Sequence, residues 1–204
     1  MIEFTLSKIN LLILVVALFS IISFFSLNVG KIFLVNEVKQ EMDKYALTLN
    51  SMLVAPTTCD SKPFAIPPKF TSFGNNIYYR MFISTTSDPS GSRLIFAVSD
   101  IRTPTSVLAA SSLATDSKIV IIDQDNENGF QILPSNDPNA FLELDPQDVP
   151  PRNAFYAVKS VKAGLPTLYI FPCSITAQGQ NCSGKGYIKE QVNDFLPKEE
   201  QFIC

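Results

Sequence analysis

The sequence predicts an α+β protein, in which a long N-terminal helix is followed by a head domain built on a mostly antiparallel β-sheet or β-sandwich. An uncharged apolar run of 22 residues lies close to the N-terminus. All 14 prolines come after residue 55, and proline breaks helices. Beyond that point, short runs rich in Ile, Val, Tyr and Phe alternate with turn residues, as strands do. The expected organisation is a short tail over 1–8, a transmembrane helix over 9–30, an amphipathic continuation over 31–55 and a β-rich domain over 56–204.

The apolar run over 9–30 has the length of a membrane span. A helix of that length covers about 33 Å, and a hydrocarbon core is about 30 Å thick. Lys8 and Lys31 bound the run, and no residue between them is charged. A cleaved secretory signal is the alternative, but such signals have apolar cores of about 7–15 residues and end at a small-residue cleavage site. The exit from this run offers no convincing site of that kind, and we predict an uncleaved anchor in a lipid bilayer.

The orientation of the anchor is better indicated by the cysteines than by the charges. Lys8 precedes the run, and Lys31, Lys39 and Lys44 follow it among acidic residues, so the positive-inside rule barely discriminates. All four cysteines follow the run and lack C-x-x-C spacing, which is typical of disulfides, and disulfides persist outside the cytosol. We therefore predict a single-pass protein of the cell membrane with a cytoplasmic N-terminus and an extracytoplasmic C-terminal domain.

The stretch after the membrane run keeps the apolar spacing of a helix. Its apolar residues recur at intervals of three and four, as in a packed helical seam. They form the stripe Val35, Val38, Met42, Tyr45, Leu49 and Met52. We expect one helix of about 50 residues that ends at Pro56, either straight or kinked at Gly30. One expectation is that the stripe packs on the protein's own outer domain, and the other is that it assembles with the helices of other copies. Both can hold in one protein.

The outer domain shows short extended runs separated by turn residues such as those over 86–92, 123–129 and 163–166. The predicted strands are 77–83, 93–98, 118–123, 130–133, 155–162, 167–171 and 186–189. The run over 106–114 is rich in Ala and Ser, and a short helix is an alternative there.

The cysteines suggest one local bridge and one that spans the domain. Cys173 and Cys182 enclose a short loop directly after a predicted strand, so they are the natural pair. Cys59 and Cys204 would then join the two ends of the outer domain, which in the loop-entropy model contributes about 4–5 kcal/mol. The sequence alone allows other pairings, and Cys204 as a free or intermolecular thiol is the main alternative.

Several classes of function are excluded or disfavoured by composition. The chain has no histidine, which removes Ser-His-Asp and Cys-His catalysis and histidine metal sites. Its net charge is −3 and it has no basic cluster, which argues against nucleic-acid binding. No catalytic residue, cofactor-binding residue or metal ligand is assigned, and we expect a protein that is not an enzyme.

An acidic turn is the nearest approach to a cation site. Asp123, Asp125 and Glu127 resemble the start of an EF-hand loop, but the glycine comes late, at Gly129, and Pro134 occupies the place of the bidentate glutamate. A solvated hairpin turn is the expected structure, and an irregular calcium site is the alternative.

The arrangement resembles type IV pilin-like proteins, which have a long apolar N-terminal helix, an amphipathic continuation, a β-rich head and often a disulfide loop near the C-terminus. Phe4-Thr5-Leu6 is similar to the start of a pilin core. Two features depart from the pattern: no Gly or Ala precedes Phe4, where the prepilin peptidase would cut, and Lys8 stands where pilins usually carry a glutamate. The anchor also resembles archaeal single-pass proteins of surface-filament systems, including stator-like components, which need neither feature.

The resemblance implies a structural role. A minor or divergent pilin would be a component of a surface filament or secretion apparatus, and its partners would be the bilayer and other copies or other pilin-like subunits. The alternative is a membrane-tethered binding module, such as an adhesin or a stator-like protein that contacts the envelope. In that case the helix only anchors the protein, and the head carries the binding surface.

Overall fold

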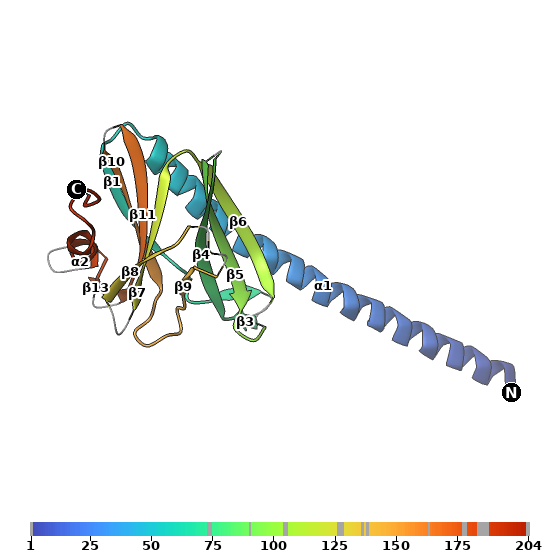
Figure 1. Ribbon diagram of the computed structural model, residues 1–204. Helices are drawn as coiled ribbons and strands as arrows, with labels where there is room; N and C mark the ends of the chain where they lie inside the picture. Colours follow the sequence, from blue (N-terminus) through green and yellow to red (C-terminus); the bar gives the residue numbers. More distant parts are fainter. Residues whose placement is uncertain are drawn as a thin grey trace.

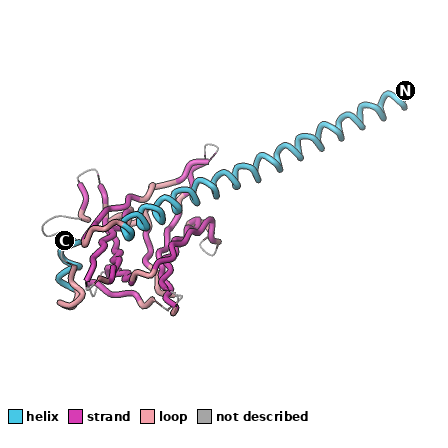
Figure 2. The backbone as a smooth tube through the Cα atoms, turned by 90° about the horizontal axis from the view of Figure 1, so that it is seen from above, coloured by secondary structure: helices cyan, strands magenta, loops and turns pink. Residues whose placement is uncertain are grey.

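The computed structural model describes residues 2–72, 75–89, 91–103, 106–125, 129–135, 137, 139–162, 164–176, 179–182 and 188–202. A single helix, α1 (Ile2–Val54), accounts for the first quarter of the chain and runs through Gly30 without interruption. It ends two residues before Pro56, as expected of a residue that cannot continue a helix. The N-terminal part of α1 projects from the head, and its C-terminal part runs across the head (Figure 2).

The rest of the chain is mainly strands, as the sequence predicts. They are β1 (Cys59–Ala65), β2 (Phe70–Ser72), β3 (Asn75–Ile77), β4 (Tyr79–Asp88), β5 (Gly91–Asp100), β6 (Val107–Thr115), β7 (Lys118–Asp125), β8 (Gly129–Leu133), β9 (Leu142–Leu144), β10 (Ala154–Lys162), β11 (Leu165–Cys173), β12 (Ile175–Thr176) and β13 (Gly179–Gln180). A second helix, α2 (Ile188–Phe195), lies near the C-terminus (Figure 1).

The strands form two main sheets. One has five strands in the order β1-β10-β11-β7-β8, and the other has four in the order β6-β5-β4-β9. Every pairing in these sheets is antiparallel except that of β11 with β7. Two short hairpins, β2–β3 and β12–β13, complete the pairing within the described residues. The α+β prediction with a mostly antiparallel head is therefore confirmed.

The main core lies between the two sheets and is closed along one side by α1. It contains side chains of α1, of the four-stranded sheet and of one face of the five-stranded sheet. A second cluster covers the other face of the five-stranded sheet and includes residues of α2. Along β10, Phe155 and Ala157 point into the first cluster and Tyr156 and Val158 into the second, because side chains alternate along a strand.

Two local expectations need correction. The Ala- and Ser-rich run over 106–114 is a strand, because β6 pairs with β5 from Ser92 with Thr115 to Ser99 with Val107. At the end of the strand predicted over 186–189, Ile188 instead begins α2. Residue 186 lies outside the described residues. Ile188, Val192 and Leu196 are buried at intervals of four, which is the spacing of one helix face.

Candidate functional site

The N-terminal part of α1 exposes a large apolar surface. From Ile9 to Phe25 every side chain is exposed, and large hydrophobic residues are found around the whole helix rather than on one face. A core helix of a soluble protein would bury at least one of its faces. This helix is long and apolar enough to cross a membrane, and it is the one such helix among the described residues. It is a candidate membrane anchor or signal sequence.

The apolar stripe of α1 packs inside the protein's own head. Five of its six residues are buried, namely Val38, Met42, Tyr45, Leu49 and Met52. Val35 is half-buried, and Leu34 is the first buried residue among the side chains of this helix that the structure describes. The first of the two arrangements considered from the sequence is therefore the one observed. These five side chains are covered by the head of their own chain, and their part in contacts between copies stays a prediction.

Tyr45 fixes the helix to the five-stranded sheet. Its hydroxyl donates a hydrogen bond to the backbone oxygen of Ala65 at 2.9 Å, and its ring meets those of Phe64 and Phe155 edge-on. Burial raises the pKa of Tyr45 far above that of a free tyrosine, and the nearby carboxylate of Glu41 raises it further. The phenol is therefore a structural hydrogen-bond donor.

The disulfide between Cys173 and Cys182 closes a loop beside α2, with the two Cα atoms 5.1 Å apart. The loop is also tied internally, because the backbone N–H of Ser174 donates to the side-chain oxygen of Asn181 at 2.6 Å. Cys59 is also disulfide-bonded. Cys204, its predicted partner, lies outside the described residues, so that pairing stays a prediction.

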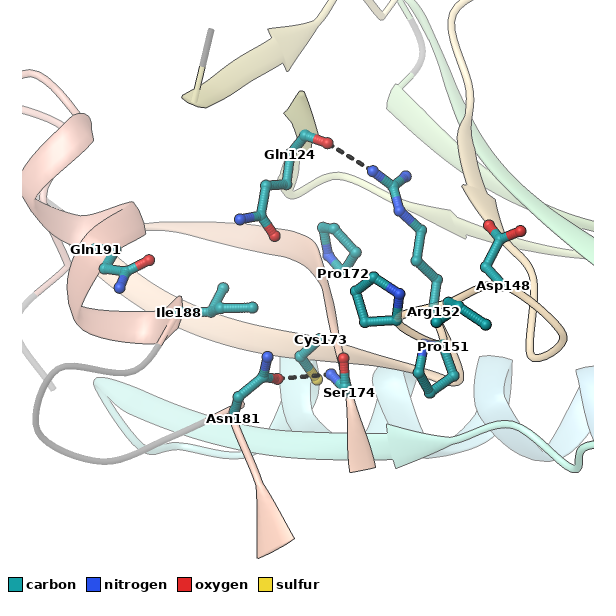
Figure 3. Close-up of a pocket in the computed structure, with 12 residues that line it drawn as sticks. Gln124, Asp148, Pro151, Arg152, Pro172, Cys173, Ser174, Asn181, Ile188 and Gln191 are labelled. Carbon is teal, nitrogen blue, oxygen red and sulfur yellow. Dashed lines mark hydrogen bonds between the residues drawn. The ribbon is translucent and has the colours of Figure 1, made fainter. Parts of the chain in front are cut away.

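A pocket of about 540 Å³ opens between this disulfide loop, the N-terminal end of α2 and the proline-rich segment that precedes β10 (Figure 3). Its apolar surface is supplied by Val149, Cys173, Ile188 and three prolines. Its polar lining consists of Gln124, Asp148, Arg152, Ser174, Asn181 and Gln191. Asp148 is the only carboxylate among these residues, so the described lining offers no pair of acids for general acid–base catalysis.

The side chain of Arg152, at the edge of the pocket, has a structural role. Its guanidinium donates to Asp123 Oδ1 at 3.0 Å, to the backbone oxygen of Gln124 at 2.6 Å and to that of Glu143 at 3.4 Å. The carboxylate of Asp123 is therefore ion-paired with Arg152, and this pairing does not indicate a metal-ion site. The side chain of Asp125 and all of Glu127 lie outside the description, and the described residues contain no cluster of metal-ligating side chains. The cation site considered for this turn has no support from Asp123.

We expect Arg152→Met to destabilise the head by about 1–3 kcal/mol, because a half-buried carboxylate loses its ion pair and two backbone oxygens lose the guanidinium donor. Urea unfolding followed by circular dichroism measures this. Arg93→Met on β5 is the matched control, because Arg93 is exposed. Equal losses in the two variants would contradict the structural role of Arg152.

Two further charged groups with structural partners were missed from the sequence. Arg80 binds both Asp145, at 2.9 Å, and Glu143, at 3.0 Å. Lys159 is 2% exposed, and its ammonium group donates to the backbone oxygen of Ala55, just past the last residue of α1. A cation there also complements the negative end of the helix dipole. The burial of Lys159 could have been predicted from the alternation of side chains along the strand. Lys159 lies on the same face of β10 as Phe155 and Ala157, which face the core.

Comparison with known proteins gives no relative for this chain: no family model, no curated protein and no solved structure matches it.

Proposed function

We propose that this protein is a single-pass, membrane-anchored structural protein with its head outside the cytosol, and that it is a pilin-like component, minor or divergent, of a surface filament or secretion apparatus. The observation that carries the proposal is the division of α1, which exposes apolar residues all round its N-terminal half and buries a stripe of its C-terminal half in the head. That division matches what the pilin resemblance implies. The loop closed by Cys173 and Cys182 fits the same pattern and an oxidising compartment.

In this proposal the apolar half of α1 serves both the bilayer and assembly. Because the stripe is covered by the head, contacts between subunits would use the projecting half, where residues such as Leu14, Leu18 and Phe25 are more than 49% exposed. Side chains of this kind pack helix against helix once water is excluded. The protein would act by contacts and not by catalysis, in line with the absence of histidine from the chain.

The experiment that tests the proposal is mass spectrometry of the N-terminus, performed on sheared surface material and on membranes from cells that make the protein. A pilin-like subunit is expected in the sheared fraction, with a trimmed N-terminus. An intact Met1 found only in membranes would instead identify a tether. A head released into the medium without the apolar run would contradict both, because the run would then be a signal sequence.

The membrane-tethered binding module is the second candidate, and the pocket beside the disulfide loop favours it. The pocket is lined by residues of four separate segments, and the disulfide and the hydrogen bond between Ser174 and Asn181 hold one wall in place. Binding sites of soluble and extracellular domains are often concave surfaces held in this way. In a tether, α1 would only anchor, and this part of the head would meet the partner.

A further inference from the structure

The head begins almost where the apolar run ends. Lys31 is the first charged residue after the run, and from Val29 onward Leu34 is the first residue of α1 that is buried. Three residues of helix separate the run from the head, a rise of about 4.5 Å. A head joined so closely to a membrane span has to lie against the bilayer surface, so one of its ends faces the lipid headgroups.

That end is identified by the way β6 lies along α1. Ser111 of β6 donates a hydrogen bond to Asp43 of α1 at 2.6 Å, and further along both elements Leu113 lines a shallow groove with Leu47 and Asn50. The helix and the strand therefore run in the same direction. Eight residues back along the helix cover about 12 Å, and four residues back along the strand cover about 13 Å. Val107, the first residue of β6, is therefore level with Val35.

Two other segments reach the same end of the head. The last residue of β5, Asp100, is paired with Tyr79, the first residue of β4, and the backbone N–H of Ile101 donates to the oxygen of Tyr78. The turn after β5 is shaped by Asp100, whose side chain accepts the backbone N–H of Arg102 at 2.8 Å. In Figure 1, β3 and one end of β6 lie close to the point where α1 leaves the head.

The exposed side chains in these segments are of the kinds that membrane interfaces favour. Phe33 and Val107 are 59% and 61% exposed, Tyr78 is 40% exposed, and the basic residues Lys31 and Arg102 are exposed with them. Aromatic side chains concentrate at the headgroup level, and lysine and arginine extend their charged ends to lipid phosphates. We call these five residues the rim.

We propose that the rim rests on the headgroup layer of the bilayer that α1 spans, with the aromatic and aliphatic side chains at the interface and the two basic residues near lipid phosphates. The inference rests on the membrane placement in the proposed function. Lipid is favoured over a second copy of the chain because the rim is continuous with the apolar run. The rim would hold the head in one orientation to the membrane.

The absence of tryptophan from the chain allows a direct test. Three single variants of the full chain, each with one tryptophan, are placed in nanodiscs made with lipids brominated at shallow or deep positions. Val107→Trp reports the rim. Leu165→Trp is the control. Leu165 is 72% exposed and lies at the turn between β10 and β11. That turn is beside the C-terminal end of α1, at the opposite end of the helix from the rim. Phe19→Trp reports the span itself.

The expected result is a blue-shifted emission from Val107→Trp that is quenched by the shallow bromolipids, with no quenching of Leu165→Trp. Adding Arg102→Glu to the Val107→Trp variant is expected to weaken that quenching in anionic discs. If Val107→Trp behaves like Leu165→Trp while Phe19→Trp is quenched by the deep bromolipids, the rim proposal fails and the anchor stands. A blue shift without bromolipid quenching also overturns it, because protein would then cover the rim. An unquenched Phe19→Trp would show that the membrane placement itself fails.

Discussion

Replacing Leu49 by alanine is expected to lower the free energy of unfolding of the head by about 2–5 kcal/mol. Leu49 has no exposed surface and belongs to the core that α1 shares with both sheets. The substitution removes the apolar contacts of the side chain and leaves a cavity that rigid neighbouring strands fill only in part. Chemical unfolding of the full chain in detergent, followed by the circular dichroism of its strands, measures the loss.

The matched control is Leu47→Ala on the same helix. Leu47 is 69% exposed, so the same chemical change should alter stability by no more than about 0.5 kcal/mol. Both variants replace a leucine of the same helix by alanine, so they remove the same atoms and change the helix propensity equally. The difference between their free energies of unfolding therefore isolates the effect of burial. A Leu49→Ala protein as stable as Leu47→Ala would mean that α1 does not form part of the head's core.

Replacing both Cys173 and Cys182 by alanine is the second large change, with an expected loss of about 2–3 kcal/mol from the greater freedom of the unfolded chain. Both residues are buried beside Val192 and Phe202, so the loss of the sulfur atoms adds a packing cost. The double variant is needed because a single remaining thiol could exchange with the disulfide at Cys59. Thermal unfolding under non-reducing conditions measures the effect.

Gln191→Ala serves as the control for the disulfide variant. Gln191 lines the same pocket from α2 but is exposed, so its replacement should leave the unfolding temperature nearly unchanged. If the pocket binds a partner, the cysteine variant should lose binding even at a temperature where the rest of the head is folded, because one wall of the pocket is then released. An unchanged unfolding temperature in the cysteine variant would contradict a stabilising role for the loop.

The long helix and the central strands could be predicted because their signals are local. The apolar run and the first proline, Pro56, set the extent of α1. The runs that became β10 and β11 are rich in β-branched and aromatic residues because they are buried on both faces. Burial on both sides puts apolar side chains at consecutive positions, which is a signal that one sequence shows clearly.

Other strands form because of contacts with distant segments, and these contacts cannot be predicted from the local sequence. β1 contains Pro63 and has low strand propensity, but it lies at the edge of the five-stranded sheet, where a missing backbone donor is tolerated. In β6, the inward positions carry small residues such as Ala109 and Ser111. Small side chains let the strand approach α1 closely, and they hide the alternation on which a prediction depends.

The candidate sites were the least predictable part, since they arise from contacts between distant segments. Arg152 meets Asp123 across 29 positions of sequence, and Lys159 meets Ala55 across 104. The pocket combines the turn before β10 with the loop after β11 and the start of α2. The residue spacing within one segment does not indicate such contacts between distant segments. The bridge between Cys173 and Cys182 was predictable because its loop is short.

The continuity of α1 has a mechanical consequence. Because the same helix is the buried wall of the head and the projecting apolar rod, with no break at Gly30, continuous helical backbone joins the head to the projecting half. A sideways pull on the head would be delivered as a torque to the rod, and a change in the rod's tilt would swing the outer end of the head like the arm of a lever. The orientation of the head is therefore tied to that of the projecting half of α1.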